Sequence, residues 1–241
     1  MSQFKTLLKR MVGEPALGAL DYLRHPELRD RWGGPFNGQS ARVALFRSLV
    51  AKLKPRAIIE TGTYHGTTTE FMAQTGLPIF TVESHPRDYG FSRARLLRYR
   101  HVTVRQDDSR QFLSGLFHGP LQSFADQTLF AYLDAHGEKD LPLADEIDLI
   151  FRHCRAAVIM IDDFQVPDDS GYRYDNYGAE ALTRAYIERS ISGHELQAFY
   201  PSVPAAKETG MRRGCVVLAK RSVHAAALAS IPELRTAEPF C

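Results

Sequence analysis

The chain has 241 residues, of which 44% are hydrophobic and 24% are charged, and its formal net charge is +2. This length suffices for one α/β domain with additions and for a core that needs no covalent or metal staple. The charge balance gives no reason to expect a nucleic acid as partner, and we interpret the local arginine run between residues 93 and 105 as a solvated helix face.

Apolar runs and cysteines bear on the compartment. No apolar run approaches the roughly 20 residues that span a bilayer, and the N-terminus lacks the compact apolar core of a signal peptide. The three cysteines are too few and too scattered for a disulfide framework, which fits a reducing compartment. We therefore expect a cytoplasmic protein that does not bind membranes.

The first 54 residues are predicted to form an N-terminal helical extension that covers the substrate side of the site. Helical patterns with breakers run from about residue 3 to residue 53, and the turn-rich segment 32–38 (Trp-Gly-Gly-Pro-Phe-Asn-Gly) cannot be a regular helix. A helix near residues 40–53 follows, and Pro55 ends it. The extension is a candidate homodimer surface, although amphipathic helices more often cover a core.

Strands and helices alternate after residue 55. Strands are predicted at 56–61, 79–83, 102–105, 128–134 and 157–161, with helical periodicity at 67–75, 87–99, 109–117 and 144–153. This alternation predicts right-handed βαβ crossovers. Late strands at 195–199 and 214–219 predict an antiparallel hairpin at one sheet edge. The expected fold is α/β, a Rossmann-like doubly wound, mostly parallel seven-stranded sheet with a C-terminal antiparallel hairpin and the N-terminal helical extension.

The first strand runs into a glycine-containing loop, Glu60-Thr61-Gly62-Thr63-Tyr64-His65-Gly66-Thr67. In open α/β sheets the ligand lies beyond the carboxyl ends of the strands. Gly62 permits a tight turn and close approach of a ligand, and Gly66 lets the next helix pack against the strand. Thr67 or Thr68 is expected to cap that helix. An ordinary strand-to-helix turn also favours glycine. The Gly-x-x-x-Gly spacing differs from the dinucleotide fingerprint, which argues against a nicotinamide dehydrogenase.

Acidic residues follow the next two strands. Glu83 lies about 20 residues beyond the loop, the separation expected of a carboxylate that accepts hydrogen bonds from ribose hydroxyls. Asp107-Asp108-Ser109 follows the third strand, where an acid can meet an adenine amino group and Ser109 can cap the next helix. Any one of these loops is weak evidence, but three in this order predict that Gly62, Glu83 and Asp108 surround one nucleoside.

Together these motifs resemble those of the class I S-adenosylmethionine-dependent methyltransferases, and more narrowly the branch of macrocin-type O-methyltransferases and the cephalosporin hydroxylase group. The resemblance covers about residues 32–219 and rests on Glu60-Thr-Gly-Thr-Tyr-His-Gly66, Thr81-Val-Glu83, Asp107-Asp-Ser109, Tyr132-Leu-Asp-Ala-His136 and Ile161-Asp-Asp-Phe164.

The resemblance implies S-adenosylmethionine as cofactor and residues 55–241 as the catalytic domain that binds it. It implies that Glu60, Gly62 and Gly66 shape the methionine pocket, that Glu83 holds the ribose, and that Asp108 with Ser109 flanks the adenine. Four further residues complete the expected cofactor-binding set: Thr63, Tyr64, Thr67 and Asp134. Tyr64 stands where many class I members have a glycine, which narrows the loop.

More acids follow the fourth and fifth strands, in Asp134-Ala135-His136 and Asp162-Asp163. Crowded carboxylates repel one another unless a cation or protons relieve them. Oxygen ligands suit Mg²⁺ or another hard divalent ion, so we expect Asp134, Asp162 and Asp163 to bind a metal, as acids in comparable loops do in the related branch. The alternative is that these acids cap helices or face solvent.

Asp134 and His136 are also the expected catalytic residues. His136 is the candidate general base because imidazole titrates near pH 7, although a histidine in such a loop can simply satisfy backbone groups. The segment 168–178 contains Tyr172, Tyr174 and Tyr177, and it is expected either to close over a polar substrate or to be an uninvolved surface loop.

The predicted function is therefore an S-adenosylmethionine-dependent O-methyltransferase, assisted by a divalent metal, that acts on a hydroxylated small molecule such as a sugar, a polyketide or a phenol. Two alternatives stay open. One is a hydroxylase or another enzyme on the same fold, and the other is a binding protein without turnover.

Overall fold

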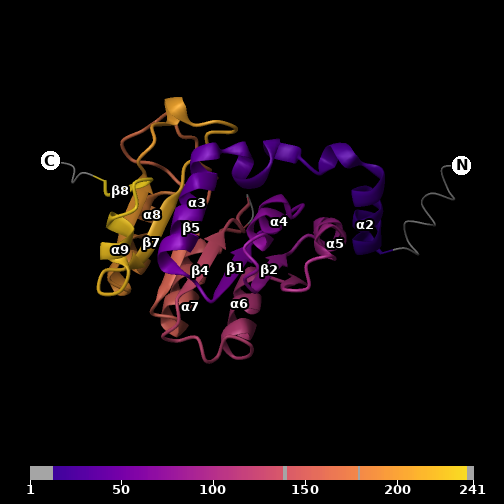
Figure 1. The fold of residues 1–241 in the computed structure, drawn as a ribbon, viewed down its shortest axis with the longest axis horizontal. Coiled ribbons are helices and arrows are strands. Elements are labelled where there is room, and N and C mark those ends of the chain that lie inside the picture. Colours follow the sequence, from indigo (N-terminus) through magenta and orange to yellow (C-terminus); the bar gives the residue numbers. More distant parts are fainter. Residues whose placement is uncertain (1–12, 138–139, 179, 238–241) are drawn as a thin grey trace, which may run out of the picture.

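The fold is known from a computed structural model that describes residues 13–137, 140–178 and 180–237, so the start of the expected helical extension lies outside the described residues. Its centre is an eight-stranded sheet in the order β3-β2-β1-β4-β5-β7-β6-β8 (Figure 1). The strands are β1 (Ala57–Thr61), β2 (Ile79–Glu83), β3 (Val102–Gln106), β4 (Leu129–Leu133), β5 (Ala157–Ile161), β6 (Leu196–Pro201), β7 (Val216–Lys220) and β8 (Leu234–Arg235).

Strand directions confirm the doubly wound α/β prediction. β1 to β5 are parallel to one another, and β7 is antiparallel to both β5 and β6. The chain order reverses between β1 and β4, which is the switch point where such sheets bind ligands. The eighth strand exceeds the predicted seven. It pairs only two residues with the end of β6, too few to leave a periodic pattern in the sequence.

Helices cover both faces of the sheet. They are α2 (Glu14–Arg24), α3 (Ser40–Leu53), α4 (Thr67–Ala73), α5 (Pro86–Leu96), α6 (Ser109–Phe117), α7 (Leu143–His153), α8 (Arg184–Gly193) and α9 (Ala225–Ala229). Alternate residues of β1 face opposite layers, because Ile58 packs with α3, α4 and α9 while Ile59 packs with α6, α7 and α8. β1, β4 and β5 are buried along their whole length, which explains their unbroken apolar runs.

The N-terminal segment runs from α2, which lies beside α5, to α3, which packs over β4 and β5 in the other half of the sheet (Figure 1). α2 packs so closely on α5 that a Cβ atom on Gly18 would lie 1.8 Å from the Arg87 carbonyl oxygen, and one on Gly90 would lie 1.8 Å from that of Pro15. From α2 the chain runs through short 3-10 turns to α3, whose side chains share a core cluster with β1 and β4. Across the described residues, no helix combines the length and apolar character needed to cross a bilayer.

Candidate functional site

A cavity of about 870 Å³ lies at the carboxyl ends of β1, β2, β3 and β4. Gly62, Glu83 and Asp108 all line it, although they follow three different strands. The rest of the predicted cofactor-binding set lines the same cavity: Glu60, Thr63, Tyr64, Gly66, Thr67, Ser109 and Asp134. The structure therefore brings these residues together, in a hollow of the size that small-molecule ligands occupy.

The glycine loop after β1 contains two glycines with positive φ. Gly62 has a φ of +82°, and a Cβ atom there would lie 2.3 Å from the Asp134 carbonyl oxygen, so only glycine fits between β1 and β4. Gly66 has a φ of +73° and is the N-cap of α4, and a Cβ there would press on Ser92 and Leu96 of α5. Gly62 thus permits the tight turn that the sequence predicted, whereas Gly66 makes room for α5 and not for the strand as predicted.

The threonines of this loop bond other segments and do not cap α4. The Thr67 hydroxyl donates to the Arg29 carbonyl (3.1 Å), and the Thr68 hydroxyl accepts from the Phe36 backbone N–H (3.1 Å). Arg95 also donates to Thr67 (2.9 Å) and forms an ion pair with Glu70 (2.8 Å). Arg95 is 7% exposed, so this member of the arginine run is not solvated as expected.

Glu83 fastens the glycine loop to the end of β2. Its Oε2 accepts from the Tyr64 backbone N–H (2.7 Å) and its Oε1 from that of His85 (2.8 Å). Tyr64 has a φ of +47°, and its ring stacks on that of His65 at 4.0 Å. Burial raises the pKa of Glu83. Each carboxylate oxygen keeps a further lone pair for a donor in the cavity, such as a ribose hydroxyl.

Glu60 lies beneath the loop at the end of β1 and is 1% exposed. Its Oε2 accepts from the hydroxyls of Thr69 (2.5 Å) and Thr81 (2.6 Å), and Thr81 in turn bonds Thr63 (2.6 Å). Burial raises the pKa of Glu60 to about 8. Thr63 is therefore part of the polar support behind the loop as well as a residue of the cavity wall.

Asp108, and not Ser109, caps α6. The Asp108 carboxylate accepts from the backbone N–H groups of Arg110 (2.9 Å) and Gln111 (3.3 Å), and the Arg110 guanidinium pairs with it at 2.8 Å. Hydrogen bonding from Arg110 holds the pKa of Asp108 below its usual value. Ser109 is the first residue of the helix, where its side chain cannot occupy the cap position.

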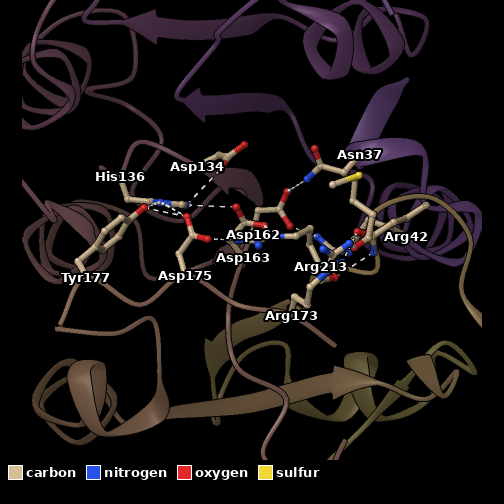
Figure 2. A network of polar contacts seen from close by, with 12 residues as sticks. Asn37, Arg42, Asp134, His136, Asp162, Asp163, Arg173, Asp175, Tyr177 and Arg213 are labelled. Atoms are coloured by element: carbon tan, nitrogen blue, oxygen red, sulfur yellow. Dashed lines mark hydrogen bonds and ion pairs between the residues drawn. The ribbon is translucent and has the colours of Figure 1, made fainter. Parts of the chain in front are cut away.

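A second group of polar residues forms around His136 (Figure 2). One atom each from Asp134, His136 and Asp163 lies within 4.8 Å of the others. The His136 Nε2 atom is 3.2 Å from Asp134 Oδ1 and 4.0 Å from Asp163 Oδ2. On the other side of the ring, Nδ1 is 2.8 Å from the Tyr177 hydroxyl, which donates to Asp175 Oδ2 at 2.7 Å.

Asp162, expected to be a metal ligand, lies outside this group. Its carboxylate is fully buried and accepts hydrogen bonds from Arg42, from the Tyr132 hydroxyl (2.5 Å) and from the Asn37 amide (3.1 Å). Both residues follow β5, and the backbone turn at Asp163, where φ is +53°, directs the two carboxylates to different partners. The third member of the group is therefore His136, and not Asp162 as the sequence predicted.

Arg213, from the segment before β7, neutralises part of the acidic group. Its Nε donates to Asp163 Oδ1 (2.5 Å), and its Nη2 pairs with Asp175. Burial and the neighbouring Asp162 raise the pKa of Asp163. Burial alone would lower the pKa of His136, but Asp134, Asp163 and Asp175 outweigh it and raise that pKa to about 9. These acids therefore favour a cation in their midst.

Sequence reasoning missed Arg42, Asp175 and Arg213. Arg42 had a visible signal, because it interrupts the apolar stripe of the helix that carries Leu45 and Leu49. Arg213 had none, since an arginine before a strand is usually solvated. The tyrosines of segment 168–178, the expected lid, do not all have the same surroundings. Tyr172 is 3% exposed and belongs to the core, whereas Tyr177 reaches His136.

Comparisons with known proteins bear on the fold. No protein-family model matches the chain, and no curated protein does. Among solved structures, the chain is similar to a candidate O-methyltransferase from Klebsiella pneumoniae, with a TM-score of 0.56 and 19% sequence identity. The match covers 80% of this chain and 86% of that chain.

Two further structures are similar at a TM-score of 0.51. One comes from work on the conversion of a disulfide bond into a thioacetal group in echinomycin biosynthesis, with 14% identity and coverage of 79% and 84%. The other is the methyltransferase domain of bacterial CtHen1, with 12% identity and coverage of 74% and 97%. The chain therefore has the Rossmann-like fold of the class I methyltransferases.

Proposed function

We propose that this protein is an S-adenosylmethionine-dependent O-methyltransferase that acts on a hydroxylated small molecule, such as a sugar, a polyketide or a phenol, with the help of a divalent metal ion. One observation carries the proposal. The three loops suited to a nucleoside and the group around His136 line the same cavity. A donor of methyl groups and an acceptor hydroxyl could thus meet in one place.

S-adenosylmethionine supplies a methyl group already activated by its sulfonium, so the chain must mainly align the reactants. Good alignment lowers a barrier by roughly 7 to 11 kcal/mol in well-oriented systems. Gly62 lets the loop turn tightly against β4 at the edge of the cavity, and Glu83 offers a carboxylate to the ribose hydroxyls. Asp108 and Ser109 line the wall where β3 ends, which suits the adenine.

Proton removal from the acceptor falls to Asp134. His136 is not the base in this proposal, because its Nδ1 bonds the Tyr177 hydroxyl and its Nε2 lies beside Asp134 and Asp163 as a candidate metal ligand. Burial raises the pKa of Asp134 to about 6, which leaves most of its carboxylate ionised at pH 7 and close enough to that pH for proton transfer. The Asp134 side chain is also 31% exposed, so an acceptor in the cavity can reach it.

The residues around His136 fit a divalent metal ion. They supply two carboxylates and one imidazole within 4.8 Å of one another, and the buried His136 Nε2 has no hydrogen-bond partner among the described residues. When bound, such an ion lowers the pKa of a hydroxyl that it coordinates. The chain itself holds Asp163 in place through Arg213 and the His136 ring through Tyr177.

The part of the cavity wall that comes from the N-terminal segment suits a small polar acceptor. Trp32 and Arg31 contribute an aromatic ring and a guanidinium, and Asn37 contributes an amide. Trp32 is 51% exposed and has a φ of +67°, an unusual backbone conformation of the kind that gathers at binding sites. Such a wall can stack on a sugar or a phenol and bond its hydroxyls.

Calorimetry with S-adenosylhomocysteine and with NAD tests the cofactor. We expect binding of the first only. The Glu83→Gln variant should bind it about 10- to 100-fold more weakly, because a hydrogen bond to a charged group contributes about 1.5 to 3 kcal/mol. The Glu188→Gln variant, altered on the exposed side of α8, is the matched control and should bind normally. Binding of NAD alone would refute the proposal.

A screen of hydroxylated acceptors tests turnover. Release of S-adenosylhomocysteine from S-adenosylmethionine in the presence of an acceptor would establish the transferase, and Asp134→Asn should abolish this release. A protein that binds the cofactor but methylates no sugar, polyketide or phenol would instead be a binding protein or an enzyme of another class.

A further inference from the structure

We infer that Asp134, His136 and Asp163 form a mixed nitrogen and oxygen site for a divalent transition-metal ion of the Mn²⁺ to Zn²⁺ series, with Tyr177 and Arg213 orienting its ligands. The role of the ion in catalysis rests on the proposed function, but its binding does not. The sequence predicted three aspartates and Mg²⁺, and the structure places an imidazole where the third aspartate was expected.

Hydrogen bonding decides which His136 nitrogen is available. The Tyr177 hydroxyl has one proton, and it donates that proton to the Asp175 carboxylate, which can only accept. The Tyr177 oxygen must then accept from His136, so Nδ1 carries the hydrogen. In the neutral ring Nε2 therefore has a free lone pair.

The Nε2 atom lies close to two carboxylates. The His136 side chain is 7% exposed, and its Nε2 lies 3.2 Å from Asp134 Oδ1 and 4.0 Å from Asp163 Oδ2. Despite these short distances, Nε2 forms no hydrogen bond of adequate geometry with a described residue. A buried polar atom without a partner destabilises the folded protein. A cation held by these three residues would remove that cost without needing a linear hydrogen bond.

Charge in the group matches a dication. Asp134, Asp163 and Asp175 are three carboxylates, and Arg213 contributes one positive charge. With a neutral imidazole the group keeps two negative charges. Asp162 does not enter this count because Arg42 neutralises it.

Two neighbours hold the ligands in place. Arg213 binds Asp163 through Oδ1, which leaves Oδ2 on the side of His136. The Tyr177 hydroxyl and Asp175 hold the imidazole from behind, the arrangement in which a metal-bound histidine gives its other N–H to an oxygen backed by a carboxylate. Figure 2 shows this chain from Asp175 through Tyr177 to the His136 ring.

The imidazole determines the kind of ion. Nitrogen ligands suit Zn²⁺, Co²⁺ and other transition ions, whereas Mg²⁺ takes oxygen ligands and keeps most of its water. Once Nε2 is a ligand, His136 cannot act as a general base. The Asp134 carboxylate has two oxygens, so one can bind the ion while the other accepts the proton of the substrate.

Co²⁺ titration of the chelator-treated full-length protein tests the site. We expect visible absorption bands from bound Co²⁺ that persist in about a hundredfold excess of Mg²⁺. Zn²⁺ should also shift the His136 Nε2 signal in long-range ¹H–¹⁵N spectra of the wild-type protein, a readout that needs no variant. Displacement of Co²⁺ by Mg²⁺ at equal concentration, or an unchanged Nε2 signal, would overturn the inference.

Variants locate the ion. His136→Gln should weaken Co²⁺ binding at least about tenfold, and Tyr177→Phe, which keeps the ring but removes the hydroxyl, should weaken it about 10-fold. His194→Gln is the matched control, because His194 also lies beside an aspartate, Asp148, but far from the cavity. Equal Co²⁺ affinity in His136→Gln and His194→Gln would reject the site.

The experiments distinguish a failure of the metal site from a failure of the methyltransferase proposal. Cofactor binding is measured without metal, and metal binding without cofactor. Loss of the metal result with normal S-adenosylhomocysteine binding rejects this site and leaves the methyltransferase proposal standing. If the protein binds Co²⁺ through His136 but does not bind S-adenosylhomocysteine, the metal site stands and the methyltransferase proposal is rejected.

Discussion

Replacing Arg42 by methionine should expose how strongly the buried centre of the molecule depends on one ion pair. Arg42 lies on α3 and is 2% exposed, and it pairs with Asp162, which is 0% exposed. Its second nitrogen donates to the Arg213 carbonyl (2.5 Å). Methionine has a similar length, so the substitution removes the charge and its hydrogen bonds while leaving little cavity.

The expected loss in free energy of unfolding is about 3 to 5 kcal/mol, the usual result of leaving one buried charge without its partner. Asp162 would keep only the hydrogen bonds from Tyr132 and Asn37. Removing both charges, in Arg42→Met with Asp162→Asn, should cost less than the sum of the single variants. The coupling between the two positions should be about 2 to 3 kcal/mol.

Urea unfolding followed by circular dichroism measures these free energies for the wild type, both single variants and the double variant. An Arg42→Met loss below about 1 kcal/mol, or single losses that simply add, would refute the reasoning. It would mean that solvent reaches Asp162 or that another cation replaces Arg42.

The same variant has a predicted pH dependence. Burial would raise the pKa of Asp162, but Arg42 and Tyr132 hold it below its usual value. A carboxyl with a lowered pKa stabilises the fold above its unfolded pKa of about 3.9, and that stabilisation is lost as pH falls. Without Arg42, burial raises the pKa of Asp162, so the difference in stability between wild type and Arg42→Met should be largest near pH 7. It should shrink as pH falls, because Asp162 is protonated first in the variant and then in the wild type.

Two further predictions concern the cofactor loop and the N-terminal helix. Glu60 has a pKa raised to about 8, so the wild type should lose stability relative to Glu60→Gln as pH rises from about 4.5 to 8, by up to about 1.4 kcal/mol per pH unit in urea unfolding; parallel pH profiles would contradict this. Gly90→Ala should detach α2 from α5, and the measurement is faster hydrogen exchange in α2 while the sheet stays protected. Gly115→Ala is the control and should leave exchange in α2 unchanged, because a Cβ atom at Gly115 meets no atom within 4 Å. Unchanged exchange in the Gly90→Ala variant would show that the two helices can shift apart to admit the methyl group.

Much of the architecture was predictable because it depends on local patterns. Short apolar runs bounded by Pro, Gly and charged residues predicted β1 to β5 to within about two residues of their observed bounds. The late hairpin was also predicted correctly. Helix α8 was not predicted, since its weakly periodic sequence follows a long loop, and β8 exists only through its two pairs with β6.

The site was predictable only where a residue's position follows from the strand that it ends. Gly62, Glu83 and Asp108 end or follow three parallel strands, and parallel strands bring their carboxyl ends to one edge. The fate of the acid pair after β5 was not predictable in this way. Whether Asp162 or Asp163 faces the cavity depends on a backbone turn at Asp163, where φ is +53°.

By itself the sequence determined which residues form strands, which loops follow them, and hence which edge of the sheet carries the polar residues. Only the tertiary structure decided which charges meet there. Arg42 lies 120 positions from Asp162, and Arg213 lies 50 positions from Asp163. Helix and strand periodicities report on contacts within a few residues, whereas an ion pair across such distances in the chain forms only once packing has brought its two elements together.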